Sequence, residues 1–371
     1  MAHRITYKPT GIILSSALGD LSVAVDGTYV DVSLTAYSGM VTILSERYYA
    51  YLGDVTLCDL GSVLEAFMRN HAQTYADFTL SVFTDTPGNK GDSCVLHILY
   101  CDRYTVSTNI EKFLSENFLT TLAHRRVPAN ATLSLFHFAK VDESVETTVT
   151  YSFRVAGSDE IRTNTLSLKT NFVATSTGIV QLQLPLADIL TNAATFASVK
   201  TREVALLSFT VVCGQRSLTF FVDNSLDDRN SFFFRNCFNV WDFASLPLIT
   251  TAKTDVNRST AILNGTSEFY DQTTIKTYEV ETAPLTSDEA LWIDQLFTSH
   301  EVFRIETDPT NDEDPLILAP VLITESTCEV QDSDEKLNSV KFTWRYADNR
   351  PLVRLTASPD IFTQHFNIVY S

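Results

Sequence analysis

Three short stretches with helical spacing of apolar residues interrupt a chain whose other segments alternate like β-strands. In the first stretch, "VTLCDLGSVLEAFM" (55–68), a strand pattern changes to a helical one that places Leu60, Leu64 and Phe67 on one face. Asp59 directly precedes this helix, at the position where an N-cap side chain accepts free backbone N–H groups. We expect the helix to pack across its own sheet through the three apolar residues.

A second copy of this pattern follows 126 residues later. Residues 55–84 and 181–211 both run from a strand through a helix into an alternating strand, and both continue through a turn into another strand. Their sequence identity is low, so chance similarity between two strand–helix–strand units is the alternative. We interpret the copies as an internal repeat of two similar β domains, each with one helix that covers a sheet face or edge.

A third region begins after the polar, turn-rich stretch "DNSLDDRN" (223–230). It contains alternating strands and one helix, where Thr286 and Glu289 have the spacing of a capping box. The sequence therefore predicts a mainly β, multi-domain protein of β-sandwich-like domains. We place the domains at 1–125, 126–224 and 225–371, with their helices near 59–71, 185–198 and 287–299.

Charge and apolar patterning disfavour several classes of partner. The chain has 27 Lys and Arg against 45 Asp and Glu, a net charge of −18, which repels nucleic-acid phosphates. No apolar run reaches the length of about 18 residues that a membrane-spanning helix needs. The apolar core "GIIL" near the start is too short for a signal peptide. We expect no membrane insertion, no export signal and folding in a reducing compartment, with Cys94, Cys213 and Cys237 as buried free thiols.

The sequence contains no group of residues whose types and spacing indicate a catalytic or metal-binding site. The seven histidines are scattered, and His97 and His137 alternate with apolar neighbours like half-exposed strand residues. The acidic clusters at 227–228 and 312–314 have the composition of solvated turns. The second cluster lacks the central glycine and closing glutamate of a helix–loop–helix calcium motif. The sequence therefore predicts no enzyme and no cofactor or metal site.

The aromatic stretch "SFFFRNCFNVWDF" (231–243) is the most unusual local feature, with five Phe and one Trp in 13 residues. Consecutive Phe residues in a strand must point to both faces, so two layers have to cover them. The covering layers belong either to two domains of this chain or to one domain and a partner chain. The candidate residues for this subunit or interdomain interface are Phe232, Phe233, Phe234, Phe238 and Trp241.

Four segments resemble tail-region virion proteins encoded by phages and prophages of gut Bacteroidetes: "VTLCDLGSVLEAFM", "FFFRNCFNVWDF", "KTYEVETAPLTSDEALWIDQLFTS" and "PDIFTQHFNIVYS". In element order, the third region is also similar to the ring-forming domain of distal tail proteins. The resemblance implies a structural role in a tail-tip or baseplate hub, without catalytic residues. It also implies a homo-oligomer (ring, trimer or hexamer), contacts with other tail proteins, and a place in the virion tail after synthesis in the host bacterial cytoplasm.

Two other functions remain open at this stage. A carbohydrate-binding adhesin or receptor-binding protein would present exposed aromatic platforms to a host-surface glycan. Trp241, Trp292 and Trp344 are its candidates, although their apolar neighbours favour core positions. A polysaccharide hydrolase would need two carboxylates in a cleft, and such pairs have no local sequence motif.

Overall fold

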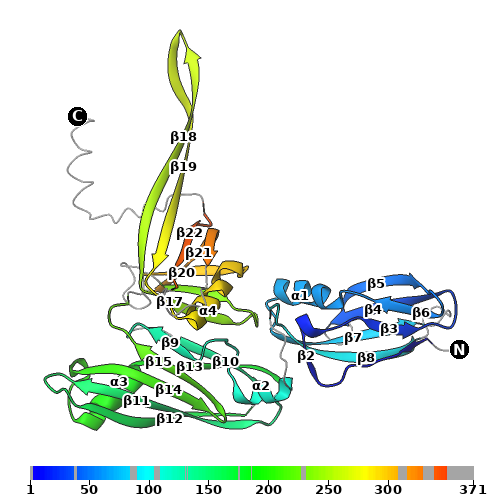
Figure 1. The fold of residues 1–371 in the computed structure, drawn as a ribbon, viewed down its shortest axis with the longest axis horizontal. Coiled ribbons are helices and arrows are strands. Elements are labelled where there is room, and N and C mark those ends of the chain that lie inside the picture. Colours follow the sequence, from blue (N-terminus) through cyan, green and yellow to red (C-terminus); the bar gives the residue numbers. More distant parts are fainter. Residues whose placement is uncertain are drawn as a thin grey trace, which may run out of the picture.

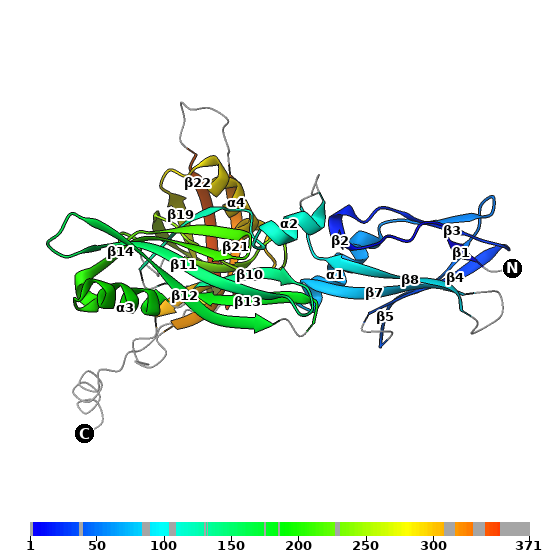
Figure 2. The same cartoon turned by 90° about the horizontal axis from the view of Figure 1, so that it is seen from below.

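Three β-rich units make up the chain in the computed structural model (Figures 1 and 2). The first and second units lie toward opposite ends of the long axis, and the third packs on the second. The prediction of a mainly β, multi-domain fold is confirmed. The structure describes residues 3–36, 40–83, 90–103, 109–129, 131, 133–173, 176–184, 186–226, 231–307, 316–328 and 338–348.

The first unit pairs a five-stranded sheet, ordered β2-β8-β7-β4-β5, with a three-stranded sheet, ordered β1-β3-β6. Burial alternates along β4 because successive strand side chains point to opposite faces of the sheet. The buried set forms one core with Leu64 and Met68 of α1. The elements are β1 (Arg4–Ile5), β2 (Ile12–Leu14), η1 (Ser15–Ala17), β3 (Leu21–Ala24), β4 (Tyr29–Ala36), β5 (Val41–Tyr49), β6 (Asp54–Leu57), α1 (Leu60–Asn70), β7 (Tyr75–Phe83) and β8 (Lys90–Leu99).

Helix α1 packs as its spacing predicts but begins differently. Leu64 is fully buried, and Phe67 is partly buried against Phe78, with 5.9 Å between ring centroids. The prediction that Asp59 caps the helix through its side chain is wrong. Its backbone is left-handed, with φ 56°, whereas a capping residue has an extended backbone that aims its side chain at the first turn. Gly61 lies so close to η1 that a Cβ would be 2.5 Å from the Ser15 carbonyl oxygen.

The second unit repeats the arrangement of the first. Its five-stranded sheet has the order β12-β11-β14-β15-β9, and β10 pairs with β13 in a second sheet. Strand for strand, this order matches β5-β4-β7-β8-β2 of the first unit, and each five-stranded sheet has a parallel edge strand, β9 or β2. The antiparallel β10–β13 pair corresponds to β3–β6. The helices start 126 residues apart, at Leu60 and Leu186, which is the spacing that the internal repeat predicts.

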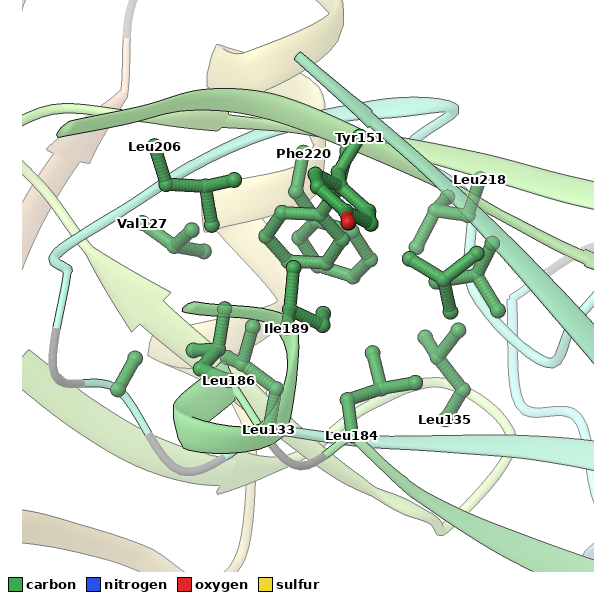
Figure 3. Close-up of a cluster of buried hydrophobic side chains, with 14 of the residues drawn as sticks. Val127, Leu133, Leu135, Tyr151, Leu184, Leu186, Ile189, Leu206, Leu218 and Phe220 are labelled. Atoms are coloured by element: carbon green, nitrogen blue, oxygen red, sulfur yellow. The ribbon is translucent and has the colours of Figure 1, made fainter. Parts of the chain in front are cut away.

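The elements of the second unit surround a large apolar core. In Figure 3, Leu186 and Ile189 of α3 lie among side chains from both sheets, including Tyr151 and Phe220. The predicted boundary after residue 125 divides β9, so the second unit begins before it. The elements are β9 (His124–Val127), β10 (Leu133–Ala139), β11 (Ser144–Val155), β12 (Ile161–Val173), β13 (Gly178–Leu184), α3 (Leu186–Ala197), η3 (Thr201–Glu203), β14 (Val204–Cys213) and β15 (Arg216–Val222). An additional helix, α2 (Ile110–Glu116), precedes β9.

The third unit is a seven-stranded sheet, ordered β17-β16-β20-β21-β22-β19-β18, with α4 packed on it. The predicted capping box at the start of α4 is confirmed, because the Thr286 hydroxyl accepts from the Glu289 N–H and the Glu289 carboxylate accepts from the Thr286 N–H. The elements are β16 (Ser231–Arg235), β17 (Trp241–Ser245), β18 (Leu248–Leu263), β19 (Thr266–Thr282), α4 (Ser287–Thr298), β20 (Val302–Thr307), β21 (Leu316–Cys328) and β22 (Val340–Tyr346).

Candidate functional site

The aromatic stretch 231–243 lies where the cores of the chain meet. Phe232 and Phe234 are buried in the core of the third unit, whereas Phe233 between them packs on the core of the second unit. Phe238 belongs to a fourth core, which collects residues from all three units. Trp241 is partly buried, and the Arg235 guanidinium lies 4.0 Å from the centre of its ring. The two layers that cover this segment therefore both come from the same chain, one from the second unit and one from the third.

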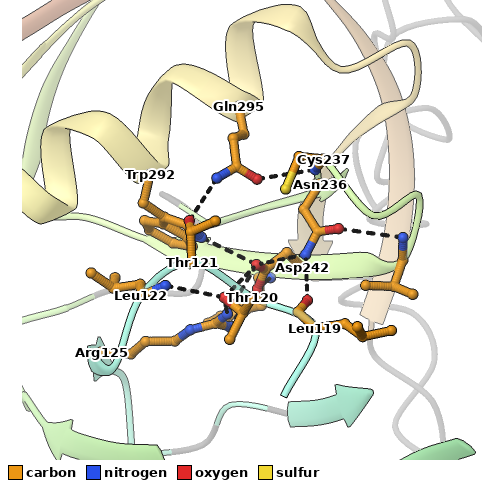
Figure 4. Close-up of polar contacts among 12 residues, drawn as sticks. Leu119, Thr120, Thr121, Leu122, Arg125, Asn236, Cys237, Asp242, Trp292 and Gln295 are labelled. Atoms are coloured by element: carbon orange, nitrogen blue, oxygen red, sulfur yellow. Dashed lines mark hydrogen bonds and ion pairs between the residues drawn. The ribbon is translucent and has the colours of Figure 1, made fainter. Parts of the chain in front are cut away.

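A buried polar network holds this junction together (Figure 4). Asp242 of β17 is 4% exposed, and its carboxylate accepts two hydrogen bonds from Arg125 of β9, the second at 2.9 Å. The indole N–H of Trp292 donates to the same carboxylate at 3.1 Å from α4. One side chain thus joins the second unit to two elements of the third. A buried carboxylate of this kind needs a paired cation and further donors, and both are present.

Amide side chains extend the network toward the chain segment before β9. Asn236 donates from Nδ2 to the Leu119 carbonyl oxygen at 2.8 Å. Gln295 of α4 accepts from the backbone N–H of Cys237 at 3.0 Å and donates to the Thr121 hydroxyl at 2.7 Å. These bonds satisfy groups that would otherwise be buried without partners, which fixes the position of α4 on the junction.

A second ion pair crosses the boundary between β9 and α4. The Arg126 guanidinium donates two hydrogen bonds, both 2.9 Å long, to the Glu289 carboxylate. Burial by itself raises the pKa of Glu289, but the hydrogen bonds from Arg126 and Thr286 outweigh burial and lower this pKa below its ordinary value of 4.5. The capping glutamate of α4 therefore also anchors the second unit.

The sequence singled out acidic clusters and tryptophans as candidates for metal, catalytic or glycan sites. No group of three or more His, Cys, Asp or Glu in them is arranged to hold a metal ion. The acidic clusters at 227–228 and 312–314 lie outside the described residues. Trp292 and Trp344 are buried, as their apolar neighbours predict, and Arg235 covers Trp241, so none of the three tryptophans offers a bare glycan platform.

His137 differs from its prediction as a half-exposed strand residue. It is 5% exposed and lines a cavity of about 250 Å³ in the second unit. Burial, together with the nearby Arg216 charge, lowers the pKa of His137 to about 4, although Glu143 acts in the opposite direction. His97 is more exposed and lies 2.7 Å from an Asp77 carboxylate oxygen. Because its pKa is lowered to about 4, the His137 imidazole is neutral at physiological pH.

A projecting ribbon is the feature that the sequence analysis missed. Strands β18 and β19 extend far beyond the sheet (Figure 1), and β19 pairs with β22 only over Tyr278–Glu281. We call residues 253–277 the ribbon, because within the described structure they pair only with each other. At about 3.3 Å per residue, the ribbon is about 35 Å long. Its signal in the sequence is the Asn264-Gly265 turn between two long alternating runs.

Apolar side chains are exposed near the tip of the ribbon. The set consists of Ile262, Leu263, Phe269 and Tyr270, each between 59% and 77% exposed. The extra residue Tyr270 lies at a register shift between the pairs Ser259–Asp271 and Thr260–Phe269. A bulge of this kind increases the twist of the two strands. The ribbon therefore ends in a twisted apolar tip that no described residue of the chain buries.

Comparisons with known proteins leave the family open. Neither a family model nor a curated protein matches the chain. Among solved structures, a plexin A4 full extracellular region is similar over 94% of this chain at 9% identity, with a TM-score of 0.20. This chain covers 40% of that chain. Among the described residues, no helix is both long enough and apolar enough to cross a membrane.

Proposed function

We propose that the chain is a structural virion protein of a phage tail that assembles with copies of itself through the ribbon. The ribbon is the observation that carries this proposal. An isolated two-stranded hairpin is marginally stable in water, and one that buries no face needs another surface. The exposed apolar tip is also typical of a contact surface. Assembly with a neighbouring subunit supplies the missing layer.

The geometry favours a ring or hub. Among the described strands, β18 is an edge strand of the seven-stranded sheet, so its outer backbone groups can pair with another chain. An arm that reaches from one copy to a different surface of the next forms a head-to-tail contact, and such contacts form a ring when the rotation between successive copies closes. The resemblance to tail-region and distal tail proteins supports this arrangement, with other tail proteins as further partners and the virion tail as the location. The role requires no catalytic residue.

The test compares the intact chain with a variant whose ribbon is shortened. Residues 254–276 are replaced by an Asn-Gly turn, which keeps every residue of β19 that pairs with β22. We expect light scattering and negative-stain electron microscopy to show rings or closed oligomers of the intact chain and monomers of the variant. A cooperative thermal melt and unchanged tryptophan fluorescence would show that the variant is folded.

A point variant separates the apolar tip from the strand edge. Ile262→Ser with Leu263→Ser removes apolar contact area but leaves backbone pairing possible, and Thr273→Ser is a matched control within the ribbon. We expect the double variant to shift assembly to higher protein concentration and the control to leave it unchanged. An intact chain that stays monomeric at every concentration, or a shortened chain that assembles normally, would contradict the proposal.

A further inference from the structure

Two cysteines from different units meet in the fourth core. Cys101 follows β8 in the first unit, and Cys237 lies between β16 and β17 in the third unit. They are 0% and 3% exposed, and their thiols are in hydrogen-bonding contact. The backbone between them is also held, because the Asp102 N–H donates to the Cys237 carbonyl oxygen at 3.3 Å.

We propose that Cys101 and Cys237 form a disulfide when the folded protein meets a low-molecular-weight disulfide oxidant. One thiolate attacks the oxidant, whose S–S bond breaks and releases one small thiol. The second protein thiolate then attacks the mixed disulfide, forms the Cys101–Cys237 bond and releases the second small thiol. The protein loses two protons and two electrons, and the oxidant gains them as it is reduced to two small thiols.

The two cysteines lie close together, because both belong to the same buried cluster and a backbone hydrogen bond joins Asp102 to Cys237. The sulfur atoms need to approach from hydrogen-bonding contact to the disulfide length of about 2.05 Å, and their neighbouring backbone is already paired. The bond would link the first unit covalently to the third. Polar contacts already join these units, including one of 2.8 Å from the Asn239 side chain to the Gln73 carbonyl oxygen.

Burial makes the reaction slow rather than absent. It raises the pKa of the Cys237 thiol, and the neighbouring Cys101 thiol raises it further, so little thiolate exists at neutral pH. The oxidant also has to reach the fourth core, which requires the junction to open briefly. In the folded protein the crosslink therefore forms slowly.

The experiment treats the native protein with oxidised glutathione, unfolds it, alkylates the remaining thiols and maps the peptides by mass spectrometry. We expect a monomer lighter by two hydrogens, a peptide pair joined through Cys101 and Cys237, and a melting temperature raised by several degrees until dithiothreitol is added. Cys237→Ser or Cys101→Ala should abolish all three, whereas Cys94→Ser is the matched control and should keep them.

The exposed Cys58 serves as an internal control, because its glutathione adduct shows that the oxidant is active. The proposal is overturned if Cys101 and Cys237 are both alkylated in full while Cys58 carries the adduct. It is also overturned if Cys237 stops at a glutathione adduct. Because the peptides are mapped in the unmodified chain, the result does not depend on the folding of any variant.

Discussion

Replacing Asp242 by alanine should destabilise the third unit by about 3–5 kcal/mol. The substitution leaves the Arg125 guanidinium, 5% exposed, with the Thr120 hydroxyl as its remaining hydrogen-bond acceptor among the described residues. The Trp292 ring, 5.3 Å away, replaces little of the lost attraction. An unpaired buried cation accounts for most of the cost. The orphaned indole N–H of Trp292 adds about 1 kcal/mol, which is not independent of the first term.

Tryptophan fluorescence during urea unfolding measures this loss. All three tryptophans of the chain, Trp241, Trp292 and Trp344, lie in the third unit, so their emission reports that unit. The matched control is Glu281→Ala, which removes a pair with Lys341 at 3.0 Å in the same unit.

The side chains of this control pair, Glu281 and Lys341, are 56% and 64% exposed. The control should therefore lower the free energy of unfolding by less than about 1 kcal/mol. If the Asp242 variant unfolds at the same urea concentration as this control, the argument that burial makes the pair indispensable is wrong.

Three further predictions concern stability. Leu64→Ala should cost about 2–5 kcal/mol because the side chain is fully buried, and circular dichroism melts should show no comparable loss for the exposed Ser62→Ala. Burial lowers the folded-state pKa of His137 from 6.5 to about 4, so the unfolded chain binds its proton first and stability falls as pH drops from about 6.5 to 4. His137→Gln should flatten the melting temperature over this range, and an unchanged slope would contradict the assignment. Glu289 has a lowered pKa, so the stability that it contributes is present above 4.5 and lost as pH falls further. Glu289→Gln should make the melting temperature fall less steeply as pH drops below 4.5. A fall as steep as that of the unsubstituted chain would argue against the pairing of Glu289 with Arg126.

The candidate site was only partly accessible from the sequence. The pattern of 231–243 correctly indicated a strand covered on both faces, because three consecutive Phe residues leave no face for water. The pattern did not show whether the second covering layer comes from another domain of this chain or from a partner chain, because either would bury the same side chains. The ribbon went unrecognised because its alternation resembles that of a strand inside a sheet. Only the pairing of β19 shows that most of it lacks a third strand.

Local chemistry in the sequence determined the periodicity of the strands, the helices of the three units, the capping box of Thr286 and Glu289, and the spacing of the repeat. These features depend on residues close together in the chain, so their pattern is visible without the fold. The tertiary structure decided the pairing of Arg125 with Asp242, the contact of Cys101 with Cys237, and the edge position of β18 among the described strands. Each depends on segments far apart in sequence, and their approach is set by how the units pack rather than by any local pattern.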